Sequence, residues 1–274
     1  IIFVGLGLAL AFKATGIATA AAVAMTAALL HVLNHSWFKS LLFIGAGAVL
    51  HATGRRDLDG LGGLIHRMPR TAFFWLIGAL AISALPPLNG FVSEWLLFQA
   101  LLAGPQFPEP MLRFLTPAVG GLLALAAGLA AACFVRAYGI VFLGRPRTPA
   151  AADAHEVPLV QLVAMGLLAG LCIVGGLAGT LLTVPLQPLL VKLVGVPLPG
   201  QAGAPSPLAL VAFDPARSTY DASLIALFIV ISSTLTMLVV HRISNRRTRR
   251  APPWDCGFPN ASPQTQYTAS SFGQ

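Results

Sequence analysis

Hydrophobic positions along the chain gather into six long runs that are separated by short polar connections. The runs lie at about residues 1–12, 18–53, 71–103, 117–143, 158–184 and 222–242. The connections are rich in Gly, Pro and Arg, as in GRRDLDGLGG and VPLPGQAGAPSP. A helix needs roughly 20 apolar residues to cross a bilayer. The pattern therefore predicts an all-α fold, a polytopic bundle of transmembrane helices.

Two of these runs have lengths that do not suit a simple crossing. Residues 18–53 number 36 and residues 71–103 number 33. Each run is too long for one upright helix and too short for two helices joined by a turn. We expect either a tilted helix or a break inside the membrane in each of them.

Composition and charge support a membrane location. The chain is 56% hydrophobic and only 9% charged, with a mean hydropathy of +0.80, whereas a soluble domain carries about 25% charged residues. The net charge of +8 does not indicate nucleic-acid binding, because most Lys and Arg residues lie in the connections 54–70 and 144–157 and after residue 241. An alternating path puts these three segments on one side. By the positive-inside rule that side, with the C-terminal tail, is predicted to be cytoplasmic.

The run 71–103 contains a helix-breaking sequence followed by a carboxylate. Pro86 and Pro87 lack backbone N–H donors, and Asn89 and Gly90 follow at once. We expect a helix broken inside the membrane, with the break facing protein or water. Glu94 is expected in the first turn of the second half-helix, where the helix dipole favours a carboxylate. Intramembrane carboxylates mark proton or ion pathways; the alternative is a kink that only shapes packing, with Glu94 snorkelling.

The stretch HVLNHSWFKS places three ionisable side chains on one helical stripe. His31, His35 and Lys39 drift only ~40° per step and span about 12 Å. Neighbours on the stripe stand ~6 Å apart, so water would have to connect them. Histidine titrates near neutral pH, and a desolvated lysine loses charge readily. We interpret the stripe as a proton relay; for either histidine alone, a satisfied polar core residue is the alternative.

Two further polar residues are secondary candidates. His51 lies ~200° around the helix from His31 and near its predicted cytoplasmic end, where it would mark a proton exit. Arg136, in FVRAYGIVFLG, lies inside a run, and snorkelling to the interface is its simpler explanation. The three cysteines form no CxxC pair, so no metal site is expected, and no cofactor-binding sequence is present.

Several of these segments resemble one protein family. HVLNHSWFKSLLFIGAGAVLHATG and RMPRTAFFWLIGALAISALPPLNGFVSEWLLFQALL resemble the relay helix and the discontinuous helix of the antiporter-like subunits shared by respiratory complex I, membrane-bound hydrogenases and Mrp antiporters. FVRAYGIVFLG and the tail WDCGFPNASPQTQYTASSFGQ resemble the hydrogenase-4 component B group, relatives of the formate hydrogenlyase membrane subunit.

The resemblance implies a division of the chain. Members of the family have two inverted repeats, each with a broken helix. Residues 1–145 match the second repeat, 146–243 would add transmembrane helices and a Pro/Gly-rich external loop, and 244–274 would form the cytoplasmic tail. Because the chain begins at Ile1 within a hydrophobic run, we expect a C-terminal fragment of a longer protein.

The resemblance also implies a function. It predicts a proton-translocating subunit in the bacterial inner membrane, partnered by other subunits of a hydrogenase- or complex I-like assembly, with no redox centre or cofactor of its own. The relay residues would be His31, His35, Lys39 and Glu94. A subunit of an Mrp-type Na⁺/H⁺ antiporter is the alternative, and a purely architectural membrane anchor is a third reading.

Overall fold

The computed structural model describes residues 1–244, 257 and 261–270 of the chain. Its α-helices are α1 (Ile2–Ala14), α2 (Ala18–Thr53), α3 (Pro69–Ile82), α4 (Asn89–Leu102), α5 (Pro110–Phe142), α6 (Pro149–Ala152), α7 (Leu159–Leu177), α8 (Gly179–Thr183), α9 (Gln187–Val194) and α10 (Ala222–Ile243). Two short strands, β1 (Ala209–Val211) and β2 (Thr219–Asp221), pair antiparallel. Among these residues, α2, α5, α7 and α10 are long and apolar enough to cross a membrane. The expected helical, polytopic fold is confirmed.

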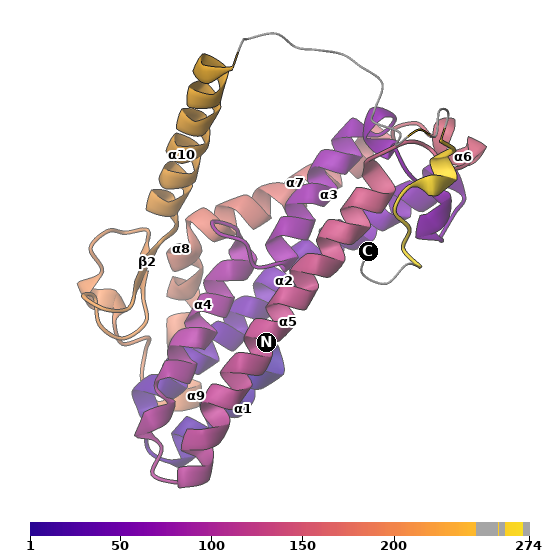
Figure 1. Cartoon of the computed structure of the whole chain (residues 1–274). Coiled ribbons are helices and arrows are strands. Elements are labelled where there is room, and N and C mark those ends of the chain that lie inside the picture. The colour runs from indigo at the N-terminus through magenta and orange to yellow at the C-terminus, as the bar shows by residue number, and fades with distance from the viewer. Residues whose placement is uncertain (245–256, 258–260, 271–274) are drawn as a thin grey trace.

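The first overlong run forms one continuous helix. α2 has 36 residues, with the bounds predicted from the sequence, and ends at Gly54, whose φ of 66° is left-handed. At 1.5 Å per residue α2 is ~54 Å long, well beyond the ~30 Å hydrocarbon core. Of the two expected solutions, a break is therefore excluded, and α2 must tilt or protrude. α2 and α5 run along the long axis of the molecule (Figure 1).

The second overlong run is broken, as predicted. α3 and α4 each have 14 residues and are separated by residues 83–88, which contain the cis bond between Pro86 and Pro87. Ala84 has a φ of 52°, an uncommon value for a residue with a side chain. The chain therefore turns sharply out of α3 before the second half-helix begins at Asn89.

Glycines let other backbone segments approach the break closely. A Cβ atom on Gly90 would lie 1.9 Å from the carbonyl oxygen of Ala81 in α3. On α7, a Cβ atom on Gly176 would lie 2.1 Å from the carbonyl oxygen of Pro87. Only glycine fits at such distances, so the broken segment packs against its own first half and against α7. The break faces protein on this side, as a membrane environment requires.

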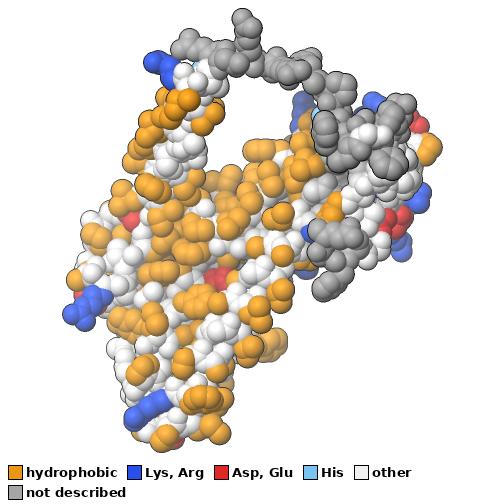
Figure 2. All heavy atoms as spheres, viewed as in Figure 1, with side chains coloured by type: hydrophobic (Ala, Val, Ile, Leu, Met, Phe, Trp, Pro, Cys, Tyr) orange, Lys and Arg blue, Asp and Glu red, His pale blue; other side chains and the backbone are white. Residues whose placement is uncertain are grey.

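The arginine-rich connections meet at one end of the molecule. Arg147 Nη1 donates to the Leu61 carbonyl at 3.0 Å, and the Gly63 N–H donates to the Leu143 carbonyl at 2.8 Å. The opposite end contains the α1–α2 turn, where Lys13 Nζ donates to the Leu193 carbonyl at 2.7 Å. On the face seen in Figure 2, hydrophobic side chains make up much of the surface between the two ends. The arginines at positions 246, 247, 249 and 250 lie outside the described residues.

The last apolar helix stands apart from the bundle. The Asp221 carboxylate caps α10 by accepting hydrogen bonds from the N–H groups of Ser223 and Leu224, at 3.0 and 3.2 Å. From there α10 projects away from the other helices (Figure 1), and within it only Ala222 is buried. Beyond its first turn, where Ile225 packs against the core, most of the apolar surface of α10 is exposed in the described chain, which suits contact with lipid or with another protein.

Candidate functional site

A buried polar network joins α2 to the second half of the broken helix. His31 Nδ1 and Ser93 Oγ lie 2.9 Å apart, at hydrogen-bond distance. Asn34 Nδ2 donates to the Asn89 carbonyl at 2.8 Å and to Ser93 Oγ at 3.3 Å. Asn89 Nδ2 donates back to Asn34 Oδ1 at 3.3 Å. All four side chains are buried, so the network fixes the start of α4 against the middle of α2.

The hydroxyl of Ser93 occupies a position from which a proton can be passed on. It lies within hydrogen-bond distance of His31 Nδ1 and donates to the Gly90 carbonyl at 3.1 Å. A hydroxyl has one proton and two acceptor sites. When it donates to Gly90 it accepts from the His31 N–H, and when it rotates it donates to an unprotonated Nδ1. Either tautomer of His31 is therefore accommodated.

Glu94 lies directly after Ser93 in the sequence and faces a cavity. The cavity has a volume of about 310 Å³ and lies between the helix break, α4 and α5, where Ser83, Trp95, Ala124 and Ala127 are among its lining residues. The Glu94 side chain is only 5% exposed, and none of the described residues donates a hydrogen bond to its carboxylate. Among its lining side chains Glu94 and Ser83 are the polar ones that could hold a water molecule, and the rest are apolar or aromatic.

The position of Glu94 on its helix differs from the sequence expectation. α4 begins at Asn89, and its first turn contains no acidic residue. Glu94 therefore lies in the second turn, and the prediction of a first-turn carboxylate was wrong. The cause is that the helix restarts directly at Asn89, without a loop after the prolines. The helix dipole acts mainly within the first turn, so its support for a charged Glu94 is weaker than expected.

The stripe on α2 is partly buried and partly exposed. The ring centroids of His31 and His35 are 6.0 Å apart, which agrees with the spacing expected for one turn. Phe38 packs edge-on against both rings, at centroid distances of 6.0 and 5.4 Å. His31 is buried, His35 is half-buried and Lys39 is exposed on the surface of α2. The structure thus brings His31 to the broken helix and leaves Lys39 on an outer face.

Two members of the network were not identified from the sequence. Asn34 lies three residues after His31, on the same face of the helix, and Ser93 directly precedes Glu94. Both are polar residues inside apolar runs, which is a usable signal for helix–helix contacts in membranes. Their partners lie 55 or more residues away along the chain, and a local pattern does not predict such pairs.

Arg136 and His51, the secondary candidates, lie away from the network. Arg136 Nη2 donates to the carbonyls of Thr268 and Ala269 at 3.1 and 2.8 Å, and its guanidinium carbon lies 5.1 Å from the centroid of the Tyr267 ring. Arg136 therefore contacts the C-terminal tail. From the sequence alone, snorkelling to the membrane interface was the simpler explanation for this side chain. His51 is exposed in the last turn of α2, and its role as an exit marker stays a prediction.

The tail is also held by a carboxylate on the connection after α2. Asp59 Oδ1 accepts a hydrogen bond from the Ala269 N–H at 2.5 Å. This bond, supported by hydrogen bonds from Ser270, lowers the pKa of the Asp59 carboxyl below its ordinary value. Two arginines complete the attachment, since Arg145 Nη2 donates to the Ala261 carbonyl and Arg147 Nη2 to the Tyr267 carbonyl.

Comparisons with known proteins agree with this architecture. Residues 8–112, which include α2 and the broken helix, match the family described as NADH:quinone oxidoreductase/Mrp antiporter, TM. Hydrogenase-4 component B of Escherichia coli (strain K12) is 47% identical over 158 residues, covering 58% of this chain and 24% of that protein. Formate hydrogenlyase subunit 3 of the same strain is 34% identical over 263 residues, covering 94% of this chain and 40% of the relative.

A solved structure shares the fold. A chain of the membrane-bound sulfane sulfur reductase (MBS), an archaeal respiratory membrane complex, superposes with a TM-score of 0.67 at 24% identity, covering 84% of this chain and 34% of that chain. The present chain spans 40% or less of the length of both curated relatives described above. The chain is therefore an antiporter-like membrane protein whose residues 8–112 match the NADH:quinone oxidoreductase/Mrp antiporter family, and it is similar to hydrogenase-4 component B and formate hydrogenlyase subunit 3.

Proposed function

We propose that this chain is part of a proton-translocating subunit in a membrane complex of the hydrogenase-4 or formate hydrogenlyase type. The complex would lie in a bacterial inner membrane, with the arginine-rich end of the chain in the cytoplasm. The observation that carries the proposal is the 2.9 Å contact between His31 Nδ1 and Ser93 Oγ, which joins the relay helix to the broken helix one residue before Glu94.

The groups on the path can each hold and release a proton. His35 and His31 are separated by 6.0 Å between ring centroids, so a water molecule would connect them. His31 would then exchange its proton directly with the Ser93 hydroxyl. From Ser93 the proton would pass through water to the carboxylate of Glu94, the next residue of α4, and from there into the 310 Å³ cavity. Histidine suits this task because it titrates near neutral pH, and intramembrane carboxylates mark proton pathways.

Lys39 would supply the driving charge. It lies two turns beyond His31 on α2 and is exposed on this chain. A lysine facing acyl chains at a helix centre costs roughly 2.5–3.5 kcal/mol. We propose that further protein covers this face in the assembled subunit, which would agree with the chain representing only a small part of its relatives' length.

We also propose that the chain is divided as its sequence suggests. Residues 1–145 would form the second repeat, residues 146–243 the additional transmembrane helices and external loop, and residues 244–274 the cytoplasmic tail.

Proton movement through this path can be measured in proteoliposomes that contain the full-length subunit in its purified complex. The initial rate of internal pH change, read from a pH-sensitive dye, is expected to fall at least tenfold in Glu94→Gln. Glu109→Gln is the matched control, since Glu109 is an exposed glutamate at the start of α5. An unchanged rate in Glu94→Gln would contradict the proposal and favour the architectural reading.

The same assay separates the proposal from an Mrp-type antiporter. There the carbonyls freed by Pro86 and Pro87, together with Glu94, would bind a cation. Proton movement would then require Na⁺ and would reverse when the Na⁺ gradient is reversed. Proton movement that is independent of Na⁺ supports the relay.

A further inference from the structure

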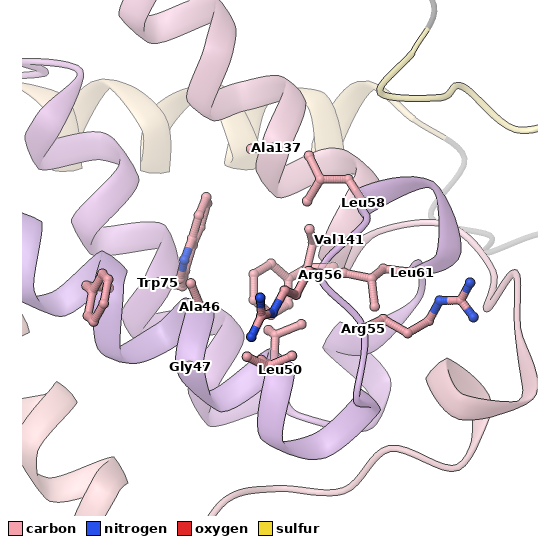
Figure 3. A pocket seen from close by; sticks show the side chains of 13 residues that line it. Ala46, Gly47, Leu50, Arg55, Arg56, Leu58, Leu61, Trp75, Ala137 and Val141 are labelled. Carbon is pink, nitrogen blue, oxygen red and sulfur yellow. The ribbon is translucent and has the colours of Figure 1, made fainter.

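An apolar cavity lies at the arginine-rich end of the molecule, away from the polar network. It has a volume of about 460 Å³, opens to the surface, and is lined by α2, α3, α5 and the connection after α2 (Figure 3). Phe43, Gly47 and Leu50 form its α2 wall, and Trp75 and Val141 form the walls from α3 and α5. Its volume lies within the range of small-molecule binding sites, about 300–1,000 Å³.

Two adjacent arginines lie at the cavity, and among the described residues only Arg55 has a carboxylate partner. Arg55 Nε pairs with Asp57 Oδ1 at 3.3 Å, so its charge is balanced. Its guanidinium points away from the cavity, whereas that of Arg56 lies over it, near Leu50 (Figure 3). Arg56 is exposed and is not paired with a carboxylate in the described part of the chain. The cavity therefore combines an apolar interior with one uncompensated positive charge at its edge.

The cavity runs along the direction in which a lipid lies. Phe43 lies ten residues before the end of α2 at Thr53, a distance of ~15 Å along the helix axis, or about half of the hydrocarbon core. Arg56 follows three residues after the end of that helix, at the arginine-rich end of the molecule, where we place the headgroup. An occupant would place apolar atoms beside Phe43 and Gly47 and an anionic group beside Arg56. Basic pockets between transmembrane helices bind anionic headgroups for this reason.

We propose that this cavity binds one anionic phospholipid, with an acyl chain between α2, α3 and α5 and the phosphate beside Arg56. Arginine suits this position because its planar guanidinium matches phosphate oxygens with two parallel hydrogen bonds. The binding site is distinct from the proton path, because it shares none of the residues of the His31–Ser93 network or of the Glu94 cavity.

The test uses the full-length subunit in its purified complex and a phosphatidylglycerol that carries a photoreactive diazirine in one acyl chain. After illumination, mass spectrometry is expected to find the adduct within residues 43–50. Unlabelled phosphatidylglycerol should remove it, whereas glycerol 3-phosphate and phosphatidylethanolamine at the same concentration should not. Loss of the adduct with glycerol 3-phosphate would identify an ordinary phosphate site and overturn the proposal, as would equal competition by phosphatidylethanolamine.

Two variants with matched controls complete the test. Arg56→Gln should weaken binding about fivefold, which corresponds to about 1 kcal/mol for one basic residue near a lipid surface. Gly47→Leu should weaken it at least tenfold by filling the cavity, and a Cβ atom on Gly47 meets nothing within 4 Å, so the helix tolerates the change. The control for the first is Arg67→Gln, which is exposed and does not line the cavity. The control for the second is Gly128→Leu in α5, which also meets nothing within 4 Å.

Both controls should bind as the unchanged protein does. Unchanged binding in Arg56→Gln or Gly47→Leu would overturn the proposal. So would the absence of any lipid adduct within residues 43–50, because it would mean that protein covers this cavity in the complex.

Discussion

Replacing Ser93 with alanine removes the one hydroxyl that connects the two halves of the proposed proton path. The substitution deletes the contact to His31 Nδ1 at 2.9 Å and the weaker hydrogen bond from Asn34 Nδ2 at 3.3 Å. Asn34 keeps its 2.8 Å bond to the Asn89 carbonyl, so the main loss falls on His31. A buried polar group without a partner costs about 1–3 kcal/mol.

The loss of the His31–Ser93 contact also determines the expected fall in the rate of proton transport. If the Ser93 hydroxyl carries the proton, the barrier rises by at least the energy of the lost contact. One tenfold change in rate corresponds to 1.36 kcal/mol, so about 1–3 kcal/mol predicts a rate that falls about 5- to 150-fold. The initial rate of dye response in proteoliposomes measures this fall. Thermal unfolding of the purified complex measures the accompanying loss of stability.

The matched control is Ser36→Ala on the same relay helix. Ser36 is exposed, and its hydroxyl donates to the Leu33 carbonyl one turn earlier at 2.7 Å. This variant loses a serine hydroxyl and a hydrogen bond without touching the buried network, and transport should stay within twofold of the unchanged protein. Full transport in Ser93→Ala, in a complex that assembles normally, would refute the path through this hydroxyl.

Three further substitutions test other parts of the structure. Gly90→Ala would place a Cβ atom 1.9 Å from the Ala81 carbonyl oxygen, so the break must shift and stability should fall by about 1–3 kcal/mol in thermal unfolding. Lys39→Ala removes an exposed side chain and should change stability by less than about 0.5 kcal/mol, while proton movement in proteoliposomes stops. Asp59→Asn should weaken tail attachment. Because the folded pKa of Asp59 is lowered, its contribution is present above the ordinary value of 3.8 and is lost as pH falls through the lowered value. The protection of the Ala269 amide against exchange, relative to an unfolded chain at the same pH, should therefore be lost only at strongly acidic pH in the unchanged protein.

Each of these substitutions has a control of the same kind. Gly121→Ala in α5 meets nothing within 4 Å and should retain or gain stability, since alanine favours helix. Lys13→Ala removes a positive charge at the opposite end and should leave transport intact. Asp153→Asn removes an exposed carboxylate and should leave exchange at Ala269 unchanged. Equal effects in a variant and its control would contradict the corresponding reasoning.

The bounds and breaks of the helices could be predicted wherever they depend on covalent chemistry or on contact with lipid. The bounds of α2 follow from one uninterrupted apolar run, and its end follows from Gly54, which takes a left-handed φ of 66°. The break before α4 follows from Pro86 and Pro87, which remove two hydrogen-bond donors regardless of the surroundings. These features depend on neighbouring residues in the sequence and on the membrane environment. Both can be inferred from the sequence before the fold is known.

The partners within the site were not predictable, because they depend on packing between distant segments. The sequence identified His31 as a relay residue, and the structure adds that its contact is Ser93, 62 residues later. Arg136 illustrates the same limit. Its position inside an apolar run suggested snorkelling, whereas the carbonyls that it binds belong to residues 132 and 133 positions away. Only the fold brings such groups together.

The rigid geometry of α2 gives the proposed mechanism a way to act over distance. Lys39 and His31 lie on one unbroken helix, eight residues or ~12 Å apart along its axis. At an effective dielectric constant of about 20, two unit charges at that separation interact with about 1.4 kcal/mol. An energy of that size corresponds to about a tenfold change in an equilibrium constant, and His35 lies only four residues, or ~6 Å, from Lys39 along the same axis. A flexible or kinked helix would let the distance vary and dilute this coupling. The continuity of α2, next to a helix that is broken, therefore suits the proposed relay. α2 is one rod that holds the interacting charges at fixed spacing, and the interrupted helix presents Ser93 to His31 and turns Glu94, the next residue, toward α5.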